Sequence, residues 1–119
     1  MYQMTNLLSA GTLTGDAVKN HKGDDLGKVE ELMIDAESGR IEYAVLSFGG
    51  FLGVNNKLFA VPWQSLKVDR TEKCLRLDAE KEQLESAPGF DKDNWPNMAD
   101  PQWYEPVRGY YEKALRRAV

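Results

Sequence analysis

The chain has 119 residues, a length that suits one domain with a single hydrophobic core. Hydrophobic residues make up 42% and charged residues 29%, and the formal net charge is −4. This acidic balance argues against a nucleic-acid partner, because phosphate binding needs a clustered positive field. Cys74 is the single cysteine, which excludes an intrachain disulfide and a cysteine metal cage and fits a reduced, cytoplasmic compartment.

The N-terminal residues 1–12 are small and polar, and we expect a loose arm there. No Lys or Arg precedes the first apolar residues, so the segment does not have the pattern of a secretory signal. The longest uncharged stretch, residues 43–56, is interrupted by glycines and is too short for a membrane-spanning helix. The sequence therefore predicts no direct insertion into a membrane.

Residues 13–78 predict β structure, because turn signals recur at short intervals. We expect six strands, at about 14–19, 27–35, 41–48, 57–61, 67–69 and 74–77, with one helical turn at 62–66. The pair Glu30 and Glu31 interrupts the alternation of the second strand and predicts a bulge. The third strand is apolar on both faces beyond Glu42, which predicts a central strand covered on both sides.

Six short strands leave two exposed edges unless the sheet closes. We therefore predict a mainly β fold, in which residues 13–78 form a small closed six-stranded barrel filled by side chains. Residues 79–119 predict a helical extension, with one helix at 79–86 capped by Asp78 and a second at about 106–118. This extension holds six of the twelve aromatic residues: Phe90, Trp95, Trp103, Tyr104, Tyr110 and Tyr111.

Several short motifs in residues 13–78 occur together in a characteristic order. They are Leu26-Gly27-Lys28-Val29, Gly39-Arg40-Ile41, Tyr43-Ala44-Val45-Leu46-Ser47, Gly49-Gly50-Phe51-Leu52-Gly53 and Val61-Pro62-Trp63. In these motifs the chain resembles the PRC-barrel family. That module occurs in the cytoplasmic part of the photosynthetic reaction-centre H subunit and in the C-terminal half of a bacterial ribosome-maturation factor. The resemblance implies a closed β-barrel that serves as a docking module, with no catalytic residues to carry over.

Two groups of apolar side chains are candidates for an interaction surface. Phe51 and Leu52 lie in a glycine-rich loop, where they either pack on the barrel or contact another chain. The second group consists of aromatic and aliphatic residues that either cover the barrel or build an interface with a second copy or another protein. Its members are Trp63, Trp103, Tyr110, Tyr111 and Leu115.

The residues that could carry chemistry do not form a recognisable catalytic, metal or cofactor site. His21 is the single histidine and lies in a predicted turn, and no spacing supplies a partner for a triad or a metal. We therefore expect no enzymatic activity and no cofactor. The sequence favours a non-catalytic adaptor that binds a protein partner and forms a homodimer. The alternatives are a barrel that binds a small ligand or a metal, and an accessory subunit of a membrane electron-transfer complex.

Overall fold

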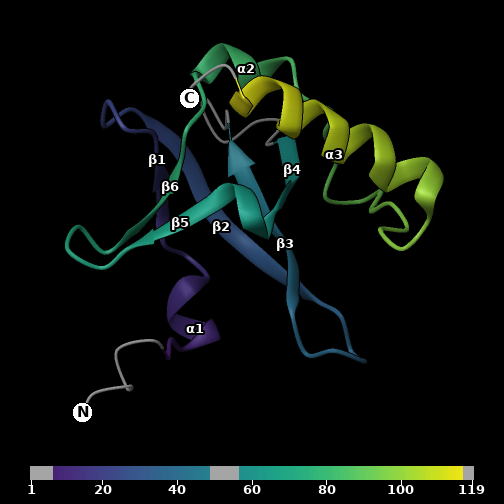
Figure 1. The fold of residues 1–119 in the computed structure, drawn as a ribbon, viewed down its shortest axis with the longest axis horizontal. Helices are drawn as coiled ribbons and strands as arrows, with labels where there is room; N and C mark the ends of the chain where they lie inside the picture. The colour runs from purple at the N-terminus through teal and green to yellow at the C-terminus, as the bar shows by residue number, and fades with distance from the viewer. Residues whose placement is uncertain (1–6, 49–56, 117–119) are drawn as a thin grey trace.

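The computed structural model describes residues 7–48 and 57–116, with side chains up to residue 113 (Figure 1). The elements, in chain order, are α1 (Ala10–Leu13), β1 (Ala17–Lys19), β2 (Asp25–Ile34), β3 (Ile41–Phe48), β4 (Lys57–Pro62), the 3-10 turn η3 (Trp63–Ser65), β5 (Leu66–Asp69), β6 (Cys74–Leu77), α2 (Lys81–Glu85) and α3 (Pro101–Arg116). The mainly β character and the C-terminal helix agree with the sequence prediction. Helix α1 lies where we expected a loose arm, and its Leu13 is buried in the core.

The six strands form one curled sheet, a half-barrel, in the order β4-β3-β2-β1-β6-β5. Neighbouring strands are antiparallel except β1 and β6, which pair in parallel. The predicted closure is wrong, because the described strands leave β4 and β5 at the two ends of the sheet. Closure would require a ladder between those two strands, yet η3 joins them as a short turn at one corner (Figure 1).

The open edge of β4 is covered by the segment that follows α2. Leu58 donates its N–H to the carbonyl of Phe90 at 2.9 Å and accepts the Phe90 N–H at 2.8 Å. The neighbouring Gly89 permits this approach, because a Cβ there would lie 2.7 Å from the Leu58 carbonyl oxygen. Backbone outside the sheet therefore pairs with Leu58 at this edge.

Strand β3 is buried on both faces, as its sequence predicts. Ala44 and Leu46 point into the main core, where they pair in register with Val61 and Phe59 of β4. On the opposite face Val45 is also fully buried. On that face Tyr43, two residues before Val45, packs against Trp103 of α3, so α3 contributes to the cover there.

The predicted bulge in β2 is present. The pairing register between β2 and β3 shifts between Val29 and Glu31, so that Glu30 is the extra residue. Close to it, Gly27 has a φ of +116° and approaches Ser47 so nearly that a Cβ would stand 2.1 Å from its carbonyl oxygen. Only glycine fits at this crossing of the two strands.

The helices begin at residues other than those we predicted. Helix α2 starts after Glu80, whose N–H donates to Gln83 Oε1 at 2.7 Å, whereas Asp78 instead contacts His21. Helix α3 starts at Pro101, and Asp100 Oδ1 accepts the Gln102 N–H at 3.0 Å as an N-terminal cap. Pro106, the expected start, lies inside the helix. Proline is favoured at the first position of a helix, so Pro101 and Pro106 are both compatible with a helix start. The helix begins at Pro101, where Asp100 provides the N-terminal cap.

Candidate interaction groove

The aromatic side chains of α3 pack onto the chain's own sheet and α2. Trp103 meets the ring of Tyr43 edge-to-face, with ring centroids 5.6 Å apart. The Tyr110 hydroxyl donates a hydrogen bond to the Gln83 carbonyl. Tyr111 is 1% exposed and belongs to the core. For these three residues the structure shows packing within the chain, and a further contact with another chain stays a prediction.

Tyr111 brings a polar group into an apolar environment. In the described part of the chain, no hydrogen-bond partner reaches its hydroxyl. Burial raises the pKa of Tyr111 well above its ordinary value of 10.0, because the phenolate would lose its hydration. This hydroxyl has no visible role in holding the fold together.

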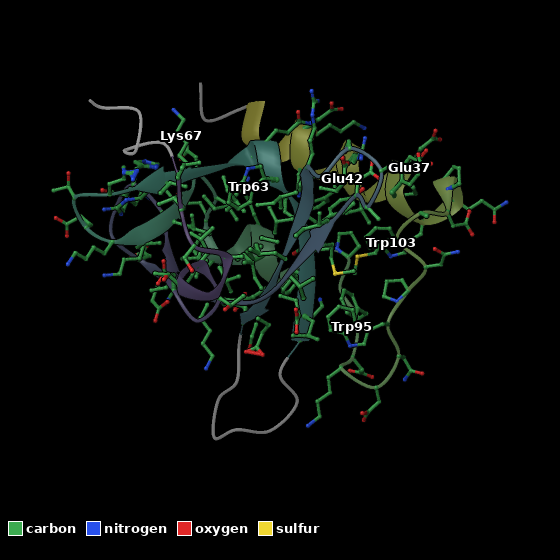
Figure 2. All side chains as sticks on the ribbon, turned by 90° about the horizontal axis from the view of Figure 1, so that it is seen from below. Glu37, Glu42, Trp63, Lys67, Trp95 and Trp103 are labelled. Atoms are coloured by element: carbon green, nitrogen blue, oxygen red, sulfur yellow. The ribbon has the colours of Figure 1, made fainter. Side chains whose placement is uncertain are left out.

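Trp63 has a different environment, on an open groove of about 730 Å³. The groove is built by four segments far apart in the sequence: the arm with α1, the start of β3, η3 and α3. We call it the Trp63 groove; its apolar lining is Leu7, Leu8, Leu13, Ile41, Pro62 and Trp63. Leu7 is 70% exposed and Leu8 45% exposed, which is unusual for adjacent leucines. Figure 2 labels Trp63 and Glu42, two of the residues that line the groove.

Arg108 of α3 forms one end of the Trp63 groove. Its Nη2 lies 3.1 Å from Glu42 Oε1, and its Nε donates to the Tyr43 hydroxyl at 2.9 Å. The guanidinium also lies over the ring of Tyr104, 4.9 Å from the ring centroid. The hydrogen bond to Tyr43 and the nearby Glu42 carboxylate raise the pKa of Arg108. Arg108 thus holds α3 against β3 and is fixed in position at the groove.

Arg40 lies at the rim of the same groove, just before β3. Its side chain is exposed, and no carboxylate within the described ranges forms an ion pair with it. Since Glu42 is matched by Arg108, Arg40 leaves this groove with a local excess of positive charge. That excess contrasts with the net charge of −4 on the whole chain.

A second groove, of about 600 Å³, lies on the other side of Arg108. Met33, Ile34 and Met98 contribute apolar surface to it, and Ile34 is 53% exposed. It has no tryptophan in its lining. Glu42 and Arg108 line both grooves and form the ridge between them.

Three of the sequence candidates have no described side chain. Phe51 and Leu52 lie outside the described residues, and Leu115 lies on α3 beyond the last described side chain. Sequence reasoning found Trp63 but missed Leu7, Leu8 and Arg40. These residues are far apart in the sequence and come together only in the folded chain, so no spacing pattern in the sequence indicates that they share a groove.

His21 and Asp78 form an exposed pair, with His21 Nδ1 2.5 Å from Asp78 Oδ1. The pair connects the β1–β2 turn to the segment after β6, so its geometry suits a structural contact. Across residues 7–48 and 57–116, no cluster of three His, Cys, Asp or Glu side chains has the arrangement of a metal site. None of the described helices is both long and apolar enough to cross a membrane.

The curled six-stranded sheet with its 3-10 corner and helical cover defines a small β-barrel-like module. The model of the PRC-barrel domain family matches residues 6–84, so the chain belongs to that family, as its motifs suggested. A search of curated proteins finds no similar sequence.

Among solved structures, the chain is similar to a protein from Pseudomonas aeruginosa described as a 16S ribosomal RNA processing protein, RimM. The sequence identity is 15% and the TM-score 0.45. The match covers 68% of this chain and 50% of the other, so the matched region spans half the length of that protein.

Proposed function

We propose that this PRC-barrel domain is a non-catalytic protein-binding module, and that its partner binds in the Trp63 groove. One observation carries the proposal: a half-buried indole and two exposed leucines, from separate segments, face the same open groove. Tryptophan is enriched among the residues that dominate binding energy at protein interfaces. Apolar surface of this kind is uncommon on a protein without a partner.

The surroundings of the Trp63 groove support a rigid binding site. Pro62 and η3 hold the indole at the corner between β4 and β5, and Arg108 is held by Glu42 and Tyr43. A preformed site loses little conformational entropy when a partner binds. The exposed His21–Asp78 pair lies outside the lining of this groove.

Site-specific photo-crosslinking tests the proposal. p-Benzoyl-phenylalanine is placed at position 64, where exposed Gln64 borders the groove, and in a matched control at Thr71 in the exposed β5–β6 turn. In cells of the source organism we expect a crosslinked protein adduct from position 64 and none from position 71. Equal adducts from both positions, or none from position 64, would contradict a partner at this groove.

A small-molecule site is the second candidate, because a volume of about 730 Å³ lies within the range typical of small-molecule pockets. Thermal unfolding in the presence of a metabolite and metal library distinguishes a small-molecule site from a protein-binding site. A compound that raises the unfolding midpoint would favour the small-molecule site. A bound ligand at a hundred times its Kd stabilises the fold by about 2.7 kcal/mol.

Self-association and a place in an electron-transfer complex stay predictions. Trp103 and Tyr110 of α3 pack partly against the chain itself and keep part of their surface exposed. Light scattering across a concentration series decides whether a dimer forms.

A further inference from the structure

The Trp63 groove has a charge as well as a shape, and the charge restricts what binds there. We infer that its occupant is a segment of a partner protein that combines apolar side chains with at least one carboxylate. The inference rests on the proposed function and specifies the chemistry of the partner. Charge complementarity between Arg40 and the occupant is the argument for this choice over a second copy or a small molecule.

The first step concerns the apolar contact. Leu7 and Leu8 line the groove from the N-terminal arm and Trp63 lines it from η3, and Leu13 and Pro62 also belong to its lining. An apolar side chain inserted between them would remove exposed surface from both walls. The partner must therefore carry apolar residues at the groove.

The second step concerns the charge at the rim. Arg40 is exposed and has no ion pair among the described residues, whereas Arg108 already contacts Glu42 at 3.1 Å. Of the charged residues that line the groove, two are basic and one is acidic. A carboxylate next to Arg40 would gain an attractive contact, while a basic side chain would be repelled.

The third step compares the local charge at the groove with the net charge of the whole chain. The whole chain has a net charge of −4, so its overall field repels an acidic segment at long range. Screening in physiological salt limits that repulsion to about 8 Å, and Arg40 then decides the contact at close range. The preference for a carboxylate is thus a property of this groove and not of the molecule as a whole.

A random dodecapeptide library displayed on phage supplies the probe. The full chain is the bait, and the enriched peptides are synthesised with a fluorescein label. We expect enriched sequences to contain more acidic than basic residues beside apolar ones. On titration with such a peptide, the indole N–H signal of Trp63 should shift in the NMR spectrum, and that of Trp95, which is outside the groove, should stay in place.

Two charge reversals at exposed positions test the role of Arg40. Arg40→Glu should weaken peptide binding by about tenfold or more, whereas Lys28→Glu, on β2 away from the groove, should change it by less than about twofold. Both side chains are exposed, and circular dichroism confirms that each variant is folded. Trp63→Ala should abolish binding.

The inference is overturned by neutral or basic enriched peptides, by no enrichment, or by binding that Arg40→Glu leaves intact. It is also overturned if the Trp63 signal shifts with protein concentration alone, which would indicate a second copy in the groove. The proposed function fails separately, through the absence of a crosslinked protein at position 64. A crosslink at position 64 with no acidic preference would preserve the function and reject only this partner chemistry.

Discussion

Asn20 is a fully buried polar side chain that organises the turn between β1 and β2. Its Oδ1 accepts the N–H groups of Lys22 and Asp24 at 3.0 and 2.9 Å, and its Nδ2 donates to the Ala79 carbonyl at 3.1 Å. Its own carbonyl accepts a hydrogen bond from Arg76 at 2.8 Å. One amide thereby joins the first turn of the sheet to the segment that leaves its last strand.

We predict that Asn20→Ala lowers the free energy of unfolding by about 2–4 kcal/mol, because it leaves buried backbone groups without partners. Urea unfolding followed by circular dichroism measures the loss. The control is Asn94→Ala, at an exposed position in the loop before α3, with an expected change within about 0.5 kcal/mol. Equal effects of the two substitutions would show that the Asn20 network does not stabilise the turn.

Tyr110 and Tyr111 are adjacent, and their hydroxyls differ in environment. Tyr110→Phe loses the hydrogen bond to the Gln83 carbonyl and should cost about 1 kcal/mol of unfolding free energy. Tyr111→Phe removes a buried hydroxyl without a described partner and should leave stability unchanged or raise it by about 1 kcal/mol. Denaturant unfolding at pH 7 compares them, and a larger loss for Tyr111→Phe would contradict the structure.

Tyr111 also makes stability depend on alkaline pH. Its pKa is raised in the folded state, so the unfolded chain loses the proton first as the pH rises past 10.0. The stability that the raised pKa of Tyr111 contributes to the fold is complete below pH 10.0 and is lost as the pH rises above it. Tyr111→Phe should therefore lose less stability than the wild type between pH 9 and 11, as measured by urea midpoints. Parallel curves for the two proteins would reject the raised pKa.

At the scale of the elements, the close approach of β2 to β3 depends on one glycine. Gly27→Ala would place a methyl group 2.1 Å from the Ser47 carbonyl oxygen and strain a positive φ, so we expect a loss of about 3 kcal/mol or more. Gly39→Ala is the matched control, because Gly39 has a φ of +78° but no atom within 4 Å of the added Cβ. Its cost should be about 1–2 kcal/mol. Thermal unfolding compares the two, and similar midpoints would mean that the strands separate easily there.

The strands were predictable because their pattern is local. Strand β3 has the predicted bounds, β6 likewise, and the bulge at Glu30 follows from two adjacent charges. Closure was predicted wrongly, because the cover for the edge of β4 comes from Phe90, which is distant in the sequence. Side-chain pairs such as Tyr43 with Trp103 are equally distant, and so is the groove at Trp63. The local sequence pattern therefore predicts the strands, whereas the groove forms only when segments distant in the sequence pack together.

At the scale of the whole molecule, the family match and the folded unit differ in extent. The match ends at residue 84, yet Val107 and Tyr111 of α3 are buried in the main core. α3 also lies against β3 through Arg108 and Trp103. The stable unit therefore includes residues beyond the family domain.

We predict that a fragment ending at Ser86 does not unfold cooperatively. Each apolar side chain withdrawn from the core removes about 1.5–3 kcal/mol of burial free energy, against a total stability of about 5–15 kcal/mol. The fragment should bind the dye ANS and show no sharp thermal transition, whereas the full chain should show one. If the fragment unfolds at the same midpoint temperature as the full chain, α3 does not contribute to the stability of the fold.

The parallel pairing of β1 with β6 has a consequence for the order in which the chain folds. Val18 pairs with Leu75, a partner roughly sixty residues further along the chain, while the hairpins β2–β3 and β3–β4 need only near neighbours. During synthesis β1 can pair with β2 early, but its other side waits until nearly two thirds of the chain has left the ribosome. The interval leaves a nascent strand edge open to pairing with other chains, and its duration depends on the rate of translation.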